Sequence, residues 1–121
     1  LVAVILRRGY GLGAQAMTGG SLHEPLLTVA WPGAHLGPMG LEGAVRLGFK
    51  KELEAVPEGP ERQALYDKLV ARQYDNGSAV HMAATLEIDA VIDPARTRDW
   101  LVAGLQSGVV HTEKTVAIDT W

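Results

Sequence analysis

The sequence predicts an α/β fold, because two strand-like apolar runs are followed by segments with helical periodicity. Residues 1–6 are continuously apolar and rich in β-branched side chains, and residues 26–31 are nearly as apolar. Runs of this kind are typical of strands buried on both faces of a sheet. From residue 39 onward, apolar side chains recur at helical spacing instead. The combination favours layers of helix on a sheet over a half-exposed antiparallel sheet.

Length and composition limit the chain to one domain without disulfides. Its 121 residues allow one core, with 47% hydrophobic and 21% charged residues. A net charge of −3 gives no basic surface for nucleic acid, and no apolar stretch is long enough to span a bilayer. The absence of cysteine excludes thiolate metal sites and fits a reducing compartment. Because residue 1 lies inside an apparent strand, we expect a fragment that begins within a domain.

Glycine and proline separate the predicted elements. A glycine-rich turn over residues 7–13 follows the first strand, and a short helix is expected to begin at Ala14. After the second strand, residues 32–38 contain two prolines and two glycines, so a loop without regular structure is expected there.

The remaining predicted elements are helices over residues 39–55, 60–76, 78–86 and 94–107. Proline suits the first helical position at residue 60 and again at residue 94. In the last helix, we expect a buried stripe formed by Trp100, Leu101 and Leu105. The domain is therefore assigned to residues 1–107, and residues 108–121 are expected to form an extended or mobile tail.

The side chains suggest no metal site and no obvious general base. The histidines are too far apart in sequence for the usual zinc spacing: His23, His35, His81 and His111. His81 is expected to pack in or beside the core. A site without an evident acid or base suits reactions in which the enzyme mainly stabilises a charged oxygen.

The turn after the first strand is the best candidate for such a site. A strand that feeds a glycine turn into a helix leaves backbone N–H groups unpaired, and the helix dipole adds positive charge there. Phosphate, carboxylate or a developing oxyanion can bind such groups. The turn lacks the Gly-Lys-Ser/Thr of a P-loop and the acidic residue of a dinucleotide site. The alternative is that its glycines serve only to turn the chain.

Four segments in order carry a resemblance to a known family: residues 9–17, 28–32, 39–47 and 87–98. They resemble the carboxyltransferase, or β, subunit of biotin-dependent acyl-CoA carboxylases, which include the propionyl-, acetyl- and methylcrotonyl-CoA carboxylases. The last segment contains the family's Ile-Asp-Pro-x-x-Thr-Arg signature at residues 92–98. The resemblance extends over about residues 1–105.

The resemblance implies a partial crotonase-like fold, which is a superhelix of ββα units. Residues 1–107 would be the C-terminal part of the second carboxyltransferase domain. The family's first domain, which binds most of coenzyme A, has no counterpart in this sequence. Family members form homo-oligomers, typically a hexameric β core, with active sites between domains of two subunits. They work with a biotin carboxylase and a biotin carboxyl carrier, and the resemblance implies no metal.

The implied reaction moves a carboxyl group from carboxybiotin to the α-carbon of an acyl-CoA, through enolates held in oxyanion holes. The backbone amides of Leu12 and Gly13 would form one such hole, with Leu12 replacing a glycine found in many relatives. Tyr10 and Gly11 would belong to the substrate-binding turn, and Gln15 matches the position that tunes acyl-chain choice. The enzyme class implied is a ligase that forms C–C bonds.

Two alternatives remain open at this point. A biotin-dependent acyl-CoA decarboxylase subunit would share the fold, and a catalytically inert fragment would serve only in assembly. We expect the 121-residue chain to be inactive by itself, since half of the implied site is missing. The resemblance implies the cytoplasm in bacteria, or the mitochondrial matrix in eukaryotes.

Overall fold

The computed structural model describes residues 1–108, and the tail predicted from residue 108 therefore lies almost wholly outside the described residues. The strands are β1 (Val2–Ile5), β2 (Arg8–Tyr10), β3 (Leu27–Ala30), β4 (His35–Gly37) and β5 (Ala90–Val91). The helices are α1 (Gly11–Met17), α2 (Leu41–Gly48), α3 (Lys50–Glu54), α4 (Pro60–Asn76), α5 (Ala79–Ala84) and α6 (Thr97–Ser107). A 3-10 turn, η1 (Pro94–Arg96), leads into α6.

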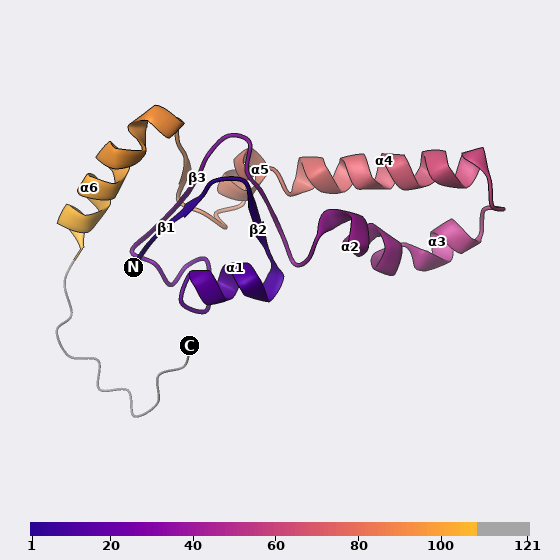
Figure 1. Ribbon diagram of the computed structural model, residues 1–121, viewed down its shortest axis with the longest axis horizontal. Helices are drawn as coiled ribbons and strands as arrows, with labels where there is room; N and C mark the ends of the chain where they lie inside the picture. Colours follow the sequence, from indigo (N-terminus) through magenta and orange to yellow (C-terminus); the bar gives the residue numbers. More distant parts are fainter. Residues whose placement is uncertain (109–121) are drawn as a thin grey trace, which may run out of the picture.

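The strands form two small parallel sheets, one with the order β1-β3-β5 and one in which β2 pairs with β4. Along the chain, β1, β2 and α1 are followed by β3, β4 and α2, so the same ββα unit occurs twice. Corresponding strands of the two units pair in parallel, with Val4 opposite Val29 and Arg8 opposite His35. The units are therefore stacked side by side in the way that a superhelix of ββα units requires (Figure 1).

The core lies between these sheets and α5. Its buried members are Ile5, Ala30, Ala34, Leu36, Ala79 and Ile88. The central strand β3 is buried over Thr28 to Ala30, with Val29 and Ala30 at 0% exposure, but Val2 to Val4 of β1 are only half-buried. The prediction that residues 1–6 form a strand buried on both faces is thus wrong for burial, because β1 lies at the edge of its sheet.

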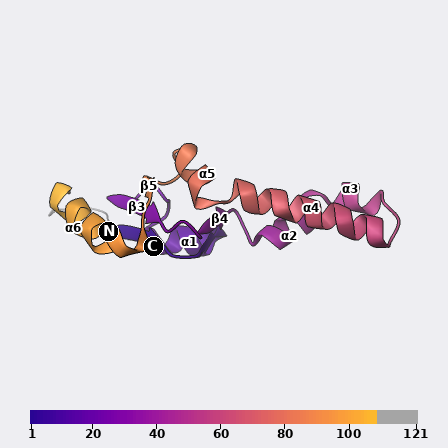
Figure 2. The same ribbon diagram turned by 90° about the horizontal axis from the view of Figure 1, so that it is seen from above.

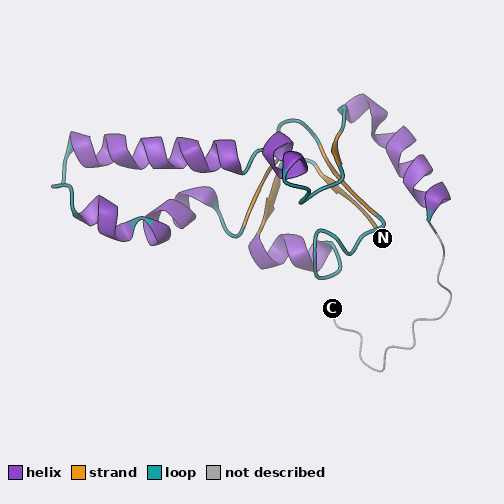
Figure 3. Ribbon diagram, turned by 180° about the vertical axis from the view of Figure 1, so that it is seen from behind, coloured by secondary structure: helices purple, strands orange, loops and turns teal. Residues whose placement is uncertain are grey.

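The helices α2, α3 and α4 form a hairpin that projects from the body of the molecule (Figures 1 and 2). Figure 3 shows the strands gathered in the body, whereas the hairpin is helical. Apolar burial in these helices is limited to Leu41 and Val45 of α2 and Leu69 of α4. The Tyr74 hydroxyl donates a 2.6 Å hydrogen bond to Glu42 and adds a polar contact near the base of the hairpin.

Two predicted irregular segments contain short strands. β2 lies in the expected turn over residues 7–13, and β4 lies in the expected loop over residues 32–38. Each strand has three residues, and it is the parallel pairing between them that makes them regular. The first helix consequently begins at Gly11 instead of Ala14. The helix predicted over residues 39–55 is divided into α2 and α3 at Phe49.

The predicted buried stripe of the last helix is also wrong. Within α6 the buried residue is Gly104, while Trp100 is 38% and Leu105 62% exposed and Leu101 is half-buried. A β-carbon at Gly104 would lie 2.9 Å from Leu27 Cδ2, so α6 approaches the sheet through a glycine. The start of α6 is held by the Trp31 indole N–H, which donates a 3.0 Å hydrogen bond to Thr97 Oγ1.

Candidate functional site

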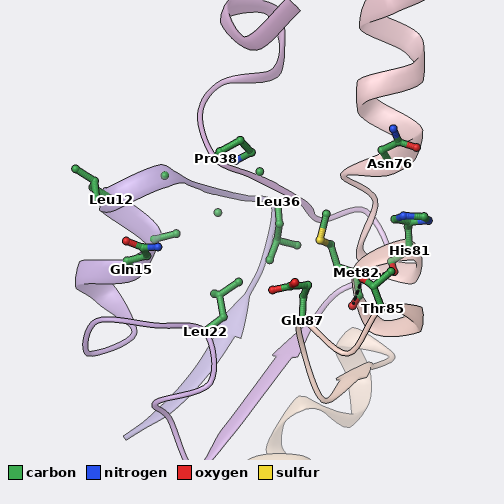
Figure 4. A pocket seen from close by; sticks show the side chains of 14 residues that line it. Leu12, Gln15, Leu22, Leu36, Pro38, Asn76, His81, Met82, Thr85 and Glu87 are labelled. Atoms are coloured by element: carbon green, nitrogen blue, oxygen red, sulfur yellow. Dashed lines mark hydrogen bonds between the residues drawn. The ribbon is translucent and has the colours of Figure 1, made fainter. Parts of the chain in front are cut away.

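A cavity of about 680 Å³ opens where α1, β4, α5 and the segment before β5 meet (Figure 4). This volume is within the range usual for small-molecule sites, about 300–1,000 Å³. Its apolar side chains include Leu22, Leu36, Pro38 and Met82, and its polar side chains are Gln15, Asn76, His81, Thr85 and Glu87. An apolar cavity with a few polar groups is the usual form of a site for a small organic ligand.

The turn into α1 can be built only with glycine at residue 11. Gly11 has a φ of +56°, and a β-carbon there would lie 2.7 Å from the carbonyl oxygen of Pro38. The turn is therefore in close contact with the end of β4. Since α1 begins at Gly11, the amides of Gly11, Leu12 and Gly13 have no carbonyl partner within the helix. These N–H groups are the donors that an anion or oxyanion would use.

The predicted site residues divide between two cavities. Gly11, Leu12 and Gln15 line the cavity described above. Tyr10 and Gly13 instead line a neighbouring cavity of about 860 Å³, which runs along β1 and α1. The structure therefore brings all five residues onto one turn of the chain but places them on two sides of α1.

The Leu12 side chain is 82% exposed and points away from the cavity (Figure 4). A leucine is consequently accommodated at this position without filling the site. The contribution that Leu12 can make to a bound ligand is through its backbone.

Tyr10 supports the turn from behind. Its hydroxyl is buried and has no hydrogen-bond partner among residues 1–108. Burial raises the pKa of Tyr10 above its usual value, and the charge of Glu42 adds to this effect while that of Arg8 opposes it. The phenol therefore stays protonated at neutral pH. The ring of Tyr10 packs beside Gly37, where an added β-carbon would lie 3.8 Å from Tyr10 Cδ1.

Sequence reasoning missed one wall of the cavity, which comes from α5 and the turn after it. Met82, Thr85 and Glu87 belong to this wall, and His81 lies at its exposed side. The prediction that His81 packs in or beside the core is wrong, because α5 turns this residue outward. These residues lie more than sixty positions after α1, so no local pattern links them to it. Glu87 is the first residue of the family-like segment over residues 87–98, and this segment is the sequence signal that could have identified it.

The backbone around Glu87 is fixed on both sides. Leu86 has a φ of 64° and is the one non-glycine residue among those described with a positive φ. The Glu87 N–H donates to the Met82 carbonyl at 2.9 Å. Two residues later, Asp89 exchanges two hydrogen bonds with the backbone of Thr28, at 2.7 and 2.9 Å. A left-handed leucine costs about 1–2 kcal/mol, so this local shape is maintained by the anchors around it.

Within the part of the chain that the structure describes, no group of three or more acidic or histidine side chains is placed to hold a metal ion. None of the described helices combines the length and the apolar character needed to cross a bilayer.

Comparison with known families decides where this fold belongs. Residues 1–117 match the carboxyl transferase domain family. The chain belongs to this family. Solved carboxyltransferases have the same arrangement of strands and helices, so the expected α/β, partial crotonase-like fold is confirmed. One of them is transcarboxylase 12S, solved as a hexamer with methylmalonyl-coenzyme A and methylmalonic acid bound. It aligns with a TM-score of 0.78 at 27% identity, over 98% of this chain and 23% of the 12S chain.

The named relatives include subunits of a biotin-dependent carboxylase and of a carboxyltransferase. The chain is 38% identical over 105 residues to the biotin-dependent acetyl-/propionyl-coenzyme A carboxylase beta6 subunit of Mycobacterium tuberculosis, covering 86% of this chain and 22% of the relative. It is 33% identical over 105 residues to the methylmalonyl-CoA carboxyltransferase 12S subunit of Propionibacterium freudenreichii, covering 87% and 20%. A single-chain long-chain acyl-CoA carboxylase aligns at 52% identity and a TM-score of 0.67, over 83% of this chain and 10% of that one. The chain thus spans about a fifth of the length of the curated relatives it matches.

Proposed function

We propose that residues 1–107 are the C-terminal part of the second domain of a carboxyltransferase subunit. In the complete protein, this subunit would transfer a carboxyl group from biotin to the α-carbon of an acyl-CoA. The proposal is supported by the family match, by the names of the relatives and by the two stacked ββα units. Since the chain spans about a fifth of those relatives, it would supply one side of a site completed by other domains.

The observation that carries the site assignment is the position of the first turn of α1, which borders the cavity at Leu12 and the neighbouring cavity at Gly13. We assign the amides of Leu12 and Gly13 to an oxyanion hole, because both are unpaired within α1. Gly11 permits the turn, and Tyr10 packs behind it. Gln15 lies one turn further along α1 at the cavity, where it would contact the acyl chain and influence its length.

Biotin, carried by a partner subunit or domain, would supply the carboxyl group in an activated form. The cavity fits the ring system of biotin, since it is apolar over much of its wall and has, at one side, amides without a carbonyl partner within α1. The residues of this chain would stabilise negative charge on a carbonyl oxygen through two fixed N–H donors, which need no reorganisation during the reaction. The apolar side chains would exclude water and strengthen this interaction. This role requires neither a metal ion nor a general base from this chain.

The proposal extends to assembly. Because transcarboxylase 12S forms a hexamer, we propose that the complete protein is a homo-oligomer of the same kind, acting with a biotin carboxylase and a biotin carboxyl carrier. The bacterial cytoplasm, or the mitochondrial matrix in a eukaryote, is the proposed compartment.

The oxyanion hole is tested by removing one N–H donor in the complete enzyme. Gly13→Pro deletes the amide proton within the first turn of α1, where proline is tolerated better than further along a helix. We expect carboxyl transfer to fall by about 10²–10³-fold, the usual effect of losing one oxyanion donor. Transfer is measured from carboxybiotin to a panel of acyl-CoA substrates, and oligomeric mass is measured alongside.

Gly13→Ala is the matched control, because it keeps the N–H. A β-carbon at Gly13 would meet no atom within 4 Å, so the loss should be far smaller than for proline. Equal turnover of the proline variant and the unmodified enzyme would refute the assignment. Transfer in the opposite direction, from a carboxylated acyl-CoA to biotin, in an enzyme that carboxylates no acyl-CoA would instead indicate a decarboxylase subunit.

A further inference from the structure

Glu87 is the one formally charged side chain that lines the cavity beside α1, with histidine counted as neutral. Figure 4 shows its carboxylate between Leu22 and Met82, directed into the cavity. The other polar side chains there, including Gln15, are neutral. The electrostatic character of this wall is therefore set by one half-exposed carboxylate.

This carboxylate has no hydrogen-bond donor from residues 1–108. Its closest contact with a basic side chain is to His23, whose Nε2 lies 3.9 Å from Glu87 Oε2, beyond hydrogen-bond distance. Both side chains are about half exposed, so the contact contributes little to stability. An ionised carboxylate only accepts hydrogen bonds. Its oxygens are therefore free to accept from a ligand in the cavity.

The opposite side of the same cavity offers donors. Gly11 and Leu12 of the first turn of α1 line it, and the Leu12 amide has no carbonyl partner within the helix. A cavity with donors at one wall and an acceptor at the other matches a group that carries a carbonyl oxygen and N–H groups together. A cyclic urea has both. An acyl thioester has the carbonyl oxygen but no N–H at the reacting carbon.

We propose that Glu87 accepts a hydrogen bond from a ring N–H of the cyclic urea of biotin and so orients the urea oxygen toward the amides of α1. This inference rests on the function proposed above and names a residue that sequence reasoning did not assign. Glu87 is a positioning residue, and its backbone is held for this role by the left-handed Leu86 and by the hydrogen bond to Met82.

The test measures binding of free biotin, and of a biotin analogue methylated at both ring nitrogens, to the complete enzyme by calorimetry. The unmodified enzyme should bind biotin more tightly than the analogue. Glu87→Leu should weaken biotin binding by about tenfold or more, as expected for a lost hydrogen bond to a charged group, and should abolish the preference. Glu87→Gln keeps an acceptor oxygen and should lie between the two.

Glu61→Gln is the control for charge. Glu61 is exposed on α4, and the change removes the same unit of negative charge away from the cavity. It should leave both affinities unchanged. As a second readout, KM for free biotin as carboxyl acceptor should rise in Glu87→Leu by a larger factor than kcat falls.

Unchanged biotin affinity in Glu87→Leu, or a preference for biotin over the methylated analogue that survives this substitution, would overturn the inference. The proposed function fails separately, if the unmodified enzyme transfers no carboxyl group to any acyl-CoA. Normal transfer together with biotin binding that is indifferent to Glu87 would therefore reject the role of Glu87 alone.

Discussion

The body of the molecule and its helical hairpin are stabilised in different ways. In the body, parallel strands and α5 enclose a continuous group of buried apolar side chains that includes Ile5, Leu36 and Ile88. In the hairpin, buried apolar residues are few, and polar contacts lie along its surface. Examples are the hydrogen bond from Tyr74 to Glu42 and the guanidinium of Arg72, which stacks 5.1 Å from the centroid of the Phe49 ring.

The difference indicates which region can hold a site with fixed geometry. The cavity is lined mostly by the body, and the hairpin reaches it only through its base at Pro38 and Asn76. Unpaired amides stabilise charge efficiently only if they are held rigidly. We therefore expect changes in the body to affect stability and function together, and changes in the hairpin to affect stability weakly.

The largest difference is expected for truncation of an apolar side chain. Leu36→Ala should lower the free energy of unfolding by about 2–5 kcal/mol, because this side chain is 2% exposed in the core. Leu47→Ala in the hairpin should change it by less than about 0.5 kcal/mol, since Leu47 is 69% exposed. Urea unfolding of both variants measures the contrast. Equal losses would show that the hairpin is as tightly packed as the body.

A second contrast uses the same glycine-to-alanine change in both regions. Gly11→Ala should destabilise by roughly 2 kcal/mol, because alanine at positive φ is strained and its β-carbon would meet the Pro38 carbonyl. Gly43→Ala in α2 should stabilise by up to about 1 kcal/mol, since nothing lies within 4 Å and alanine favours a helix. Thermal unfolding followed by circular dichroism should give shifts of opposite sign, and shifts of the same sign would contradict the assigned turn.

The smallest effect concerns the pH dependence of the hairpin. The hydrogen bond from Tyr74 holds the pKa of Glu42 below its usual value of 4.5. Because the pKa of Glu42 is lower in the folded state than in the unfolded state, its ionised carboxylate stabilises the fold above pH 4.5. This contribution is lost as the pH falls through the folded-state pKa. Tyr74→Phe should raise the pKa of Glu42 toward 4.5, measured by NMR titration of its carboxyl. Tyr66→Phe, which removes a hydroxyl bonded to Arg46 instead, should leave it unchanged.

The elements that could be predicted from the sequence are those with a strong local pattern. The apolar runs at residues 1–6 and 26–31 contain β1 and β3, and the helix expected over residues 60–76 matches α4. The strands β2 and β4 could not be predicted in this way. Each has three residues rich in glycine or flanked by proline, and its regularity depends on a partner more than twenty residues away.

For the candidate site, local pattern identified one wall. The glycine turn before α1 is visible because a glycine cluster after an apolar run is unusual, and Gly11 is required there by its positive φ. Met82 and Glu87 reach the same cavity only because α5 contacts β4 of one sheet and β5 of the other, which is a property of the tertiary fold. The stripe expected around Trp100 failed for a related reason: α6 meets Leu27 through Gly104, and periodicity weighs large apolar side chains more than small ones.

The position of β1 at the edge of its sheet has a consequence for handling the isolated chain. Among the described residues, this strand pairs on one side with β3 and leaves backbone groups on its other side unpaired. Exposed apolar edges are templates for intermolecular strand pairing and aggregation. The charges of Arg7 and Arg8, directly after the strand, oppose such pairing by mutual repulsion. Replacing them with neutral residues would be expected to reduce solubility before it changed the fold.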